Sequence, residues 1–203
     1  MTLLDQQIAL QRAAAKLGRK AASAKHLPTL LAFTDPQRSG DLAALAKALP
    51  RGSGLVYRAF GTADRLETAW RLRRITWRRG VKLIIGADVA LARLVRADGV
   101  HLPERMGGQA RRLRGFDLLT IAAHSPSAIR DGVAVGADAV VLSPILASDS
   151  PSAGRPLGVL RTAQLVRAAN GAVYGLGGID GTSAGRVAAT GVAGLAAVGV
   201  FRP

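Results

Sequence analysis

Eight short apolar segments alternate with longer helical stretches from residue 29 onward, and this alternation predicts an α/β fold, a closed TIM (β/α)₈ barrel. Unbroken alternation requires parallel strands with right-handed crossovers, and eight such units close on themselves. A partial repeat supports this prediction, because residues 96–100 (RADGV), 136–140 (GADAV) and 191–195 (GVAGL) each mark a turn into an even-numbered strand. An open doubly wound sheet is the alternative. It would leave eight unusually short strands unexplained.

The composition fits one domain over residues 1–203. Of the 203 residues 49% are hydrophobic and only 4% aromatic, so the core must be aliphatic. There is no cysteine, which excludes disulfides, thiolate catalysis and cysteine-bound metal. We divide the domain into an N-terminal helix within residues 1–26 and a barrel over residues 27–203.

The individual elements follow from periodicity and end signals. Residues 3–24 carry a rough apolar stripe that predicts a helix. The expected strands are residues 29–33, 55–58, 81–85, 99–102, 118–122, 139–142, 172–176 and 194–198. The expected helices are residues 41–49, 64–79, 89–96, 109–113, 126–135, 159–169 and 182–190. The eighth helix is missing, and we expect the N-terminal helix to cover the flank that it leaves.

The formal net charge is +15, mostly from arginine, which favours anionic partners. The densest cluster is a set of five arginines on one predicted helix, whose Leu66, Trp70 and Ile75 should face the core. Because the arginines are scattered and no aromatic residues interleave with them, nucleic-acid binding is the weaker interpretation. No apolar run is long enough for a membrane span and no secretory signal is present, so we expect a cytoplasmic protein. The sequence leaves homo-oligomerisation open.

A phosphate site is expected at the last two strands. Gly177 and Gly178 follow the seventh strand and Gly199 follows the eighth. Glycines let backbone N–H groups approach an anion, and a helix that begins near Thr182 would add its positive end. These two loops are the usual phosphate site of such barrels. The alternative is a pair of tight turns without a ligand.

Other polar residues follow the remaining strands. His124 lies past the fifth strand, where it could move protons or simply be a surface histidine. His101 alternates with Val100 and could point into the barrel mouth or be a satisfied core residue. Arg58 ends the second strand and could meet an anion. In the loop after the sixth strand, Ser148 and Ser150 offer hydroxyls to a substrate, unless that loop is only a surface segment.

Taken in order, the motifs of residues 30–201 resemble the thiamine phosphate synthase and TenI family. The shared motifs are Thr34-Asp35-Pro36, Asp98-Gly99-Val100-His101-Leu102, Ala123-His124-Ser125, Gly136-Ala137-Asp138, Pro144-Ile145, Pro156-Leu157-Gly158 and Gly177-Gly178-Ile179. The resemblance implies a (β/α)₈ barrel that binds a phosphorylated thiazole.

The chain departs from the synthase pattern at strand two and loop six. The synthases carry Gln-x-Arg-x-Lys at strand two; here Arg58 matches the arginine, but Val56 and Phe60 hold the other positions. The loop-six motif Thr-x-Thr-Lys, which grips pyrophosphate in the family, reads Ser148-Asp149-Ser150-Pro151.

The family's magnesium carboxylates are also missing. Its Asn-Asp pair after strand three reads Gly86-Ala87, and the second carboxylate position holds Met106, with Glu104 nearby but out of register. Magnesium needs carboxylate and phosphate oxygens in octahedral array. We therefore expect no metal site and no cofactor, and Mg²⁺ only if the chain is a synthase.

What remains matches the thiazole-phosphate half of the family site. In the TenI branch, which is similar to thiazole tautomerases, the histidine at the position of His124 moves a proton on a thiazole carboxylate phosphate. The resemblance thus implies metal-independent aromatisation with His124 as proton relay, and Arg58 or His101 as partner of the substrate carboxylate. A divergent thiamine phosphate synthase is the first alternative. A non-catalytic phosphate-ligand binding protein is the second.

Overall fold

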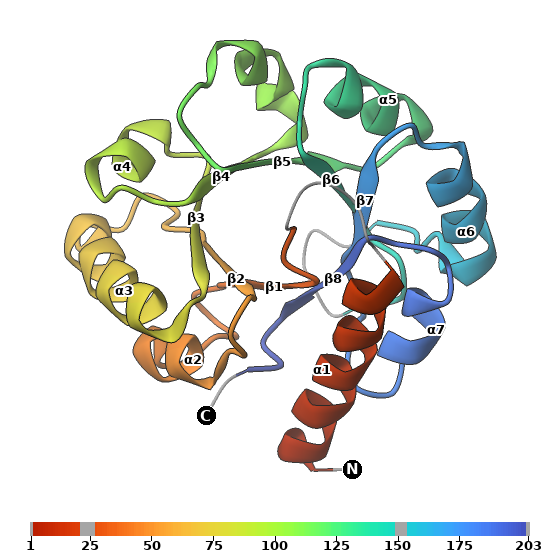
Figure 1. Cartoon of the computed structure of the whole chain (residues 1–203), viewed down its shortest axis with the longest axis horizontal. Coiled ribbons are helices and arrows are strands. Elements are labelled where there is room, and N and C mark those ends of the chain that lie inside the picture. Colours follow the sequence, from red (N-terminus) through yellow and green to blue (C-terminus); the bar gives the residue numbers. More distant parts are fainter. Residues whose placement is uncertain (1, 21–26, 149–153, 202–203) are drawn as a thin grey trace.

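The structure is a computed structural model that describes residues 2–20, 27–148 and 154–201. Eight parallel strands form one closed barrel in sequence order, with the helices around its outside (Figure 1). The strands are β1 (Leu30–Phe33), β2 (Gly54–Tyr57), β3 (Lys82–Gly86), β4 (Gly99–Leu102), β5 (Leu118–Ala123), β6 (Ala139–Leu142), β7 (Ala172–Gly175) and β8 (Gly194–Val198). The helices are α1 (Leu3–Lys20), α2 (Leu42–Ala48), α3 (Arg65–Arg79), α4 (Val89–Leu94), the 3₁₀ helix η1 (Glu104–Arg112), α5 (Pro126–Ala134), α6 (Gly158–Ala168) and α7 (Ala184–Ala188). The predicted barrel is confirmed.

The core has two parts, because alternate residues of a strand point to opposite faces of the sheet. The barrel interior is filled by a compact cluster that includes Leu31, Val56, Ile84 and Tyr174. A larger aliphatic layer lies between the strands and the helices. Arg58 directly follows β2 and His124 directly follows β5, so both stand at the carboxyl-terminal end of the barrel, which is its mouth.

The N-terminal helix α1 lies beside α7 and β8, where a helix after β8 would otherwise pack (Figure 1). Its buried face is formed by Leu10, Ala14 and Leu17. The predicted helix is confirmed over Leu3–Lys20, and residues 21–24 of the prediction lie outside the described residues. The expectation that this helix covers the last flank of the barrel is also confirmed.

The predicted core face of α3 is only partly correct, because Ile75 packs against the core but Leu66 and Trp70 do not. Leu66 and Trp70 are 41% and 43% exposed, and Trp77 is 71% exposed. The helix instead buries Thr68, Ala69, Leu72 and Thr76. Ala69, Thr68 and Thr76 are small enough for the helix backbone to lie close to the strands. Leu66, Trp70 and Trp77 are therefore left on the outward face of the helix.

The arginines of α3 therefore do interleave with aromatic residues, contrary to the expectation from the sequence. Arg73 donates to Asp98 Oδ2 at 2.6 Å, and its guanidinium lies 4.9 Å from the centre of the Trp77 ring. None of the helices in the described part of the chain is long and apolar enough to cross a bilayer.

Two helical segments differ most from their predicted bounds. After β4 the chain forms a nine-residue 3₁₀ helix, η1, rather than a helix over residues 109–113. Helix α7 spans five residues rather than residues 182–190. Its start is delayed because the Asp180 carboxylate accepts hydrogen bonds from the N–H groups of Thr182 and Ser183.

Candidate functional site

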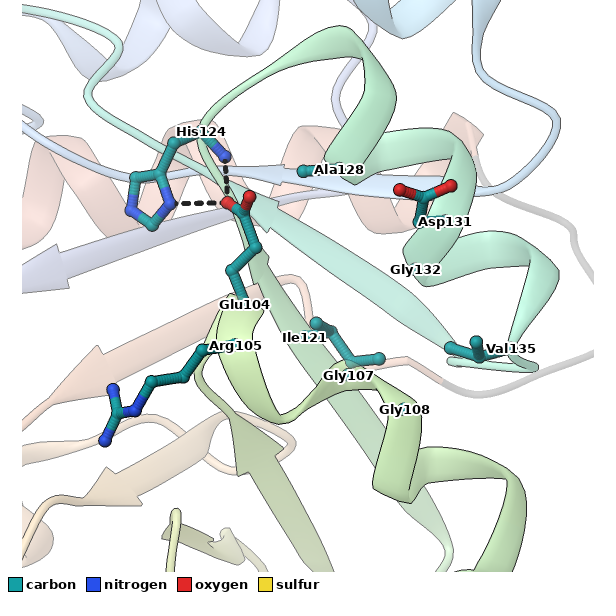
Figure 2. A pocket seen from close by; sticks show the side chains of 10 residues that line it. All are labelled: Glu104, Arg105, Gly107, Gly108, Ile121, His124, Ala128, Asp131, Gly132 and Val135. Carbon is teal, nitrogen blue, oxygen red and sulfur yellow. Dashed lines mark hydrogen bonds and ion pairs between the residues drawn. The ribbon is translucent and has the colours of Figure 1, made fainter.

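His124 lies directly after β5 and is held by a carboxylate from the neighbouring loop. Glu104 Oε2 accepts a hydrogen bond from the backbone N–H of His124 at 3.0 Å and contacts its Nδ1 at 2.8 Å (Figure 2). Strands β4 and β5 pair in register, so the residues after them emerge side by side. The His124 side chain remains 56% exposed, which leaves its ring accessible to a small molecule.

A pocket of about 600 Å³ lies beside this pair, between η1 and α5. Ile121 forms its floor on the outer face of β5, and Gly107 and Gly132 line its walls. In Figure 2 the His124 ring and the Arg105 guanidinium point away from α5, whereas Asp131 lies on that helix. None of the residues that line this pocket comes from the loops after β7 and β8, so it is separate from the expected phosphate site.

His101 and Arg58 meet above the barrel interior. The His101 ring contacts the Phe33 ring edge-on at 5.0 Å between centroids, and the Arg58 guanidinium lies 5.7 Å from the same ring. Both side chains therefore contact the interior residue Phe33, and His101, which is only 8% exposed, fits the alternative of a satisfied core histidine.

His101 is a buried, neutral histidine. Its Nδ1 lies 2.9 Å from the Thr120 hydroxyl. Burial, and then the charges of Arg58 and His124, lower its pKa to about 3. A neutral imidazole offers a carboxylate only one N–H and no charge. Of the two residues expected to meet the substrate carboxylate, Arg58 is the better candidate.

Arg58 is already partly engaged. Its Nε donates to the Thr34 carbonyl oxygen at 2.7 Å, and its Nη2 lies 3.4 Å from Asp35 Oδ2. The same carboxylate is bound by Arg38 at 2.9 Å, and this bond is the first cause of the lowered pKa of Asp35. Burial lowers the pKa of Arg58, while Asp35 opposes that effect. A substrate anion would have to share this guanidinium with Asp35.

The loops after β6 and β7 run side by side. Leu176 and Gly177 accept hydrogen bonds from the N–H groups of Ile145 and Leu146 at 2.9 and 3.0 Å. Gly178 has φ +63°, and a Cβ there would lie 2.3 Å from the Ala147 carbonyl oxygen. Gly178 is thus required for packing between the loops, whatever it binds.

The backbone N–H groups just before α7, which were expected to bind a phosphate, are already hydrogen-bonded within the chain. Helix α7 begins at Ala184, and the N–H groups of Thr182 and Ser183 already bind Asp180 Oδ1 at 2.8 and 3.0 Å. An intramolecular carboxylate therefore occupies the place that was predicted for an anion. The anion site would depend on the glycine loops alone.

Gly199 is the more open of the two glycine positions. Its φ is +75°, and the nearest atom to a Cβ there would be the Arg38 carbonyl oxygen at 3.3 Å. None of the described residues accepts a hydrogen bond from the N–H of Gly178 or of Gly199. Register pairing of β7 with β8 places both loops at the same end of the barrel. These N–H groups are the donors that a phosphate could use.

Ser148 follows the segment that runs beside the β7 loop, which brings it to the side of Gly177 and Gly178. Ser150 lies outside the described residues. The structure thus brings the backbone before Ser148 beside the loop after β7.

The positions of the family's magnesium carboxylates offer no oxygen-bearing side chain. They hold Ala87 and Met106, and Ala87 has φ +63°, a conformation in which Asp and Asn are enriched. Asp88 caps α4, and Glu104 is bonded to His124. The described residues contain no group of three potential metal-ligating side chains. These residues do not fit a magnesium pyrophosphate.

The sequence analysis did not identify the carboxylates that bind the predicted site residues His124 and Arg58. Glu104 was considered only as a displaced metal ligand, and Asp35 and Arg38 were not assigned to the site. A signal for Asp35 was present, since Thr34-Asp35-Pro36 stands directly after β1. For Glu104 no local signal exists, because its partner is 20 residues away.

Comparison with known proteins gives one consistent result. A family model described as thiamine monophosphate synthase (TMP-TENI) matches residues 30–201. "Putative thiamine-phosphate synthase 2" of Aquifex aeolicus is 31% identical over 182 residues, which cover 86% of this chain and 98% of that protein. A thiamine-phosphate synthase of Chloroflexus aurantiacus is 35% identical over 140 residues, which cover 68% of this chain and 65% of that protein. The thiamine phosphate pyrophosphorylase structure from Pyrococcus furiosus has a TM-score of 0.72 at 22% identity, with 87% of this chain and 88% of that chain covered.

Proposed function

The chain belongs to the thiamine monophosphate synthase family of thiamine biosynthesis, and we propose that within it this protein binds a phosphorylated thiazole and moves a proton on it. The reaction would convert a non-aromatic thiazole carboxylate phosphate into its aromatic tautomer. A proton leaves a ring carbon, the electron pair completes the aromatic ring, and a proton returns to the carbon at the far end of the conjugated system. No atom is gained or lost.

The observation that carries this proposal is the environment of His124. Its ring is accessible, it stands at the carboxyl end of β5, and its Nδ1 is bound to a carboxylate. An imidazole nitrogen that carries a lone pair can accept a proton and then return it. This chemistry needs no metal, which agrees with the side chains found at positions 87 and 106.

The binding half of the proposal uses the mouth of the barrel. The N–H groups of Gly178 and Gly199 would receive the phosphate, with Ser148 beside them. Arg58 would meet the carboxylate of the substrate, since it is the cation that faces the interior beside Phe33.

The direct test is incubation with the non-aromatic thiazole carboxylate phosphate, followed by ultraviolet absorbance of the aromatic product. We expect turnover that survives a chelator and is lost in His124→Asn. Turnover that is the same in His124→Asn and in the unaltered chain would contradict the assignment of the proton relay. Binding of the thiazole phosphate without turnover would instead select a non-catalytic ligand-binding role.

A second candidate function is a divergent thiamine phosphate synthase. The names of the relatives favour it, since the Aquifex protein is similar over nearly its whole length. The test adds a pyrimidine diphosphate and magnesium to the same thiazole phosphate. Release of pyrophosphate that depends on magnesium would establish this activity, and its absence alongside tautomerisation would support the first proposal.

A further inference from the structure

One carboxylate oxygen of Glu104 binds His124 twice. Oε2 accepts from the His124 backbone N–H at 3.0 Å and lies 2.8 Å from Nδ1 (Figure 2). The first contact fixes the backbone after β5, and the second fixes the rotation of the ring. Among the described residues, Glu104 is the ion-pair partner of His124.

This arrangement determines which ring nitrogen carries the proton. An ionised carboxylate can only accept hydrogen bonds, so Nδ1 must be the donor. When the ring is neutral, Nε2 then holds the lone pair. A histidine side chain free in water prefers the opposite tautomer, with the proton on Nε2. Glu104 therefore selects the form of His124 in which Nε2 can act as a base.

The contact follows from the way the chain is built around β4 and β5. Leu102, the last residue of β4, pairs with Ile121 in β5. Pro103 then directs the chain into η1, whose first residue is Glu104. A one-turn change in the start of η1 would move the carboxylate away from His124.

We propose that Glu104 is the positioning residue of His124, which holds its Nδ1–H so that Nε2 exchanges protons with the substrate; this rests on the proposed function. In the first step the Nε2 lone pair takes a proton from the ring carbon of the thiazole carboxylate phosphate. The imidazolium that forms donates through Nδ1 to Glu104, and it returns the Nε2 proton to the exocyclic carbon. Glu104 itself neither gains nor loses a proton.

The other charged groups near His124 are placed differently. Arg105 and Asp131 line the same pocket without a hydrogen bond to the ring. His101 lies on the neighbouring strand and stays neutral because it is buried. Both members of the Glu104–His124 pair are partly exposed, at 43% and 56%, so solvent screens their attraction. The contribution to rate should therefore be moderate, about five- to ten-fold.

The experiment uses the full chain with ¹⁵N-labelled histidine. Long-range nitrogen–proton correlation spectra report the tautomer of each ring, and His124→Asn assigns the His124 signals. We expect the Nδ1–H tautomer of His124 in the unaltered protein and a return to the Nε2–H tautomer in Glu104→Ala. Glu67→Gln is the matched control, because Glu67 is the other glutamate of the chain and lies on α3. A predominantly Nε2–H ring in the unaltered protein, or an unchanged tautomer in Glu104→Ala, would overturn the proposal.

Kinetics provide the second readout. Glu104→Ala should lower kcat about five- to ten-fold with little change in KM, because the substrate contacts remain intact. Glu104→Gln can still accept through its amide oxygen and should recover part of the lost rate. An unchanged kcat in Glu104→Ala would argue against the positioning role. The tautomer measurement needs no substrate, so failure of the proposed reaction would be distinguishable from failure of the Glu104 assignment.

Discussion

At the scale of single residues, the burial of His101 makes the stability of the fold depend on pH. Its folded pKa of about 3 lies below the value near 6.5 of an unfolded histidine. Between these values the unfolded chain binds a proton that the folded chain does not. The contribution of His101 to stability is therefore complete above about pH 6.5 and is lost as the pH falls toward 3, at roughly 1.4 kcal/mol per pH unit.

We predict that His101→Asn flattens the dependence of the unfolding free energy on pH between about 4.5 and 6.5. Urea titrations at several pH values measure this slope. Leu118→Val, another substitution in the barrel interior, should lower stability and keep the original slope, since it removes no titratable group. Equal slopes in His101→Asn and the unaltered chain would show that His101 does not stay neutral in the folded state.

Gly199 gives the sharper test of the phosphate site, because a side chain at Gly178 would disrupt the packing of loop six. Gly199→Ala adds a methyl group next to one expected donor N–H and forces alanine into φ +75°, with the Arg38 carbonyl oxygen 3.3 Å from the new Cβ. We predict that affinity for the phosphorylated thiazole falls roughly ten-fold or more in calorimetric titration, which corresponds to the loss of a charged hydrogen bond.

The control for this variant must carry the same backbone strain. Gly136 has φ +87°, lies before β6, and has no atom within 4 Å of a Cβ position. Gly136→Ala should lose similar stability and keep its ligand affinity. If the two variants bind the ligand equally well, the anion site lies elsewhere.

At the scale of elements, α1 supports both loops of the expected phosphate site. The Gln7 side chain donates to the Val200 carbonyl oxygen at 2.9 Å, beside Gly199. Gly181, in the loop after β7, packs against the backbone of Gln6. The helix therefore holds the loops of the expected phosphate site as well as covering the barrel.

We predict that Leu10→Ala lowers the unfolding free energy by about 2–5 kcal/mol, because Leu10 is fully buried on the inward face of α1. Leu4→Ala is the matched control, since Leu4 is 63% exposed on the same helix and should change stability by less than about 0.5 kcal/mol. Urea or thermal denaturation measures both. A similar loss in the two variants would show that α1 does not pack as described.

The elements also show where sequence reasoning succeeds and fails. The strands were predicted to within one residue at their ends, because apolar runs bounded by glycine and charged residues are strong signals. The core face of α3 was predicted only in part: Ile75 packs against the core, but Ala69 and Thr76 are buried where the two larger apolar residues were expected. The delayed start of α7 depends on Asp180, whose capping role is visible only once the loop has its shape.

At the scale of the whole molecule, the closed barrel was predictable from the count of strand–helix units. The site was predictable only in part. The glycine loops and His124 stand directly after strands, so their place at the mouth follows from topology, whereas His101 lies within β4. The pairs that act together, such as Glu104 with His124 and Arg58 with Asp35, join distant parts of the chain and depend on register and helix ends.

The missing carboxylates lead to a prediction for the whole protein. We expect no tight magnesium uptake in calorimetric titration, with or without pyrophosphate, because Ala87 and Met106 supply no side-chain oxygen. The double variant Ala87→Asp with Met106→Asp is the positive control and should bind the ion measurably. Stoichiometric uptake by the unaltered chain that is abolished in Glu104→Gln would support the synthase alternative instead.

The exposure of Trp70 and Trp77 on the outward face of α3 has a spectroscopic consequence. Trp70 and Trp77 are the two tryptophans of the chain, and both indoles face solvent on one helix. Intrinsic fluorescence should therefore show red-shifted emission in the native state and change little when the barrel unfolds. Because Arg73 lies over the Trp77 ring and further arginines flank these tryptophans, iodide should quench the native emission much more strongly than caesium. A blue-shifted emission maximum that moves on unfolding would show that these rings are covered. During unfolding, circular dichroism would then report the loss of the barrel, whereas the tryptophan emission maximum would hardly change.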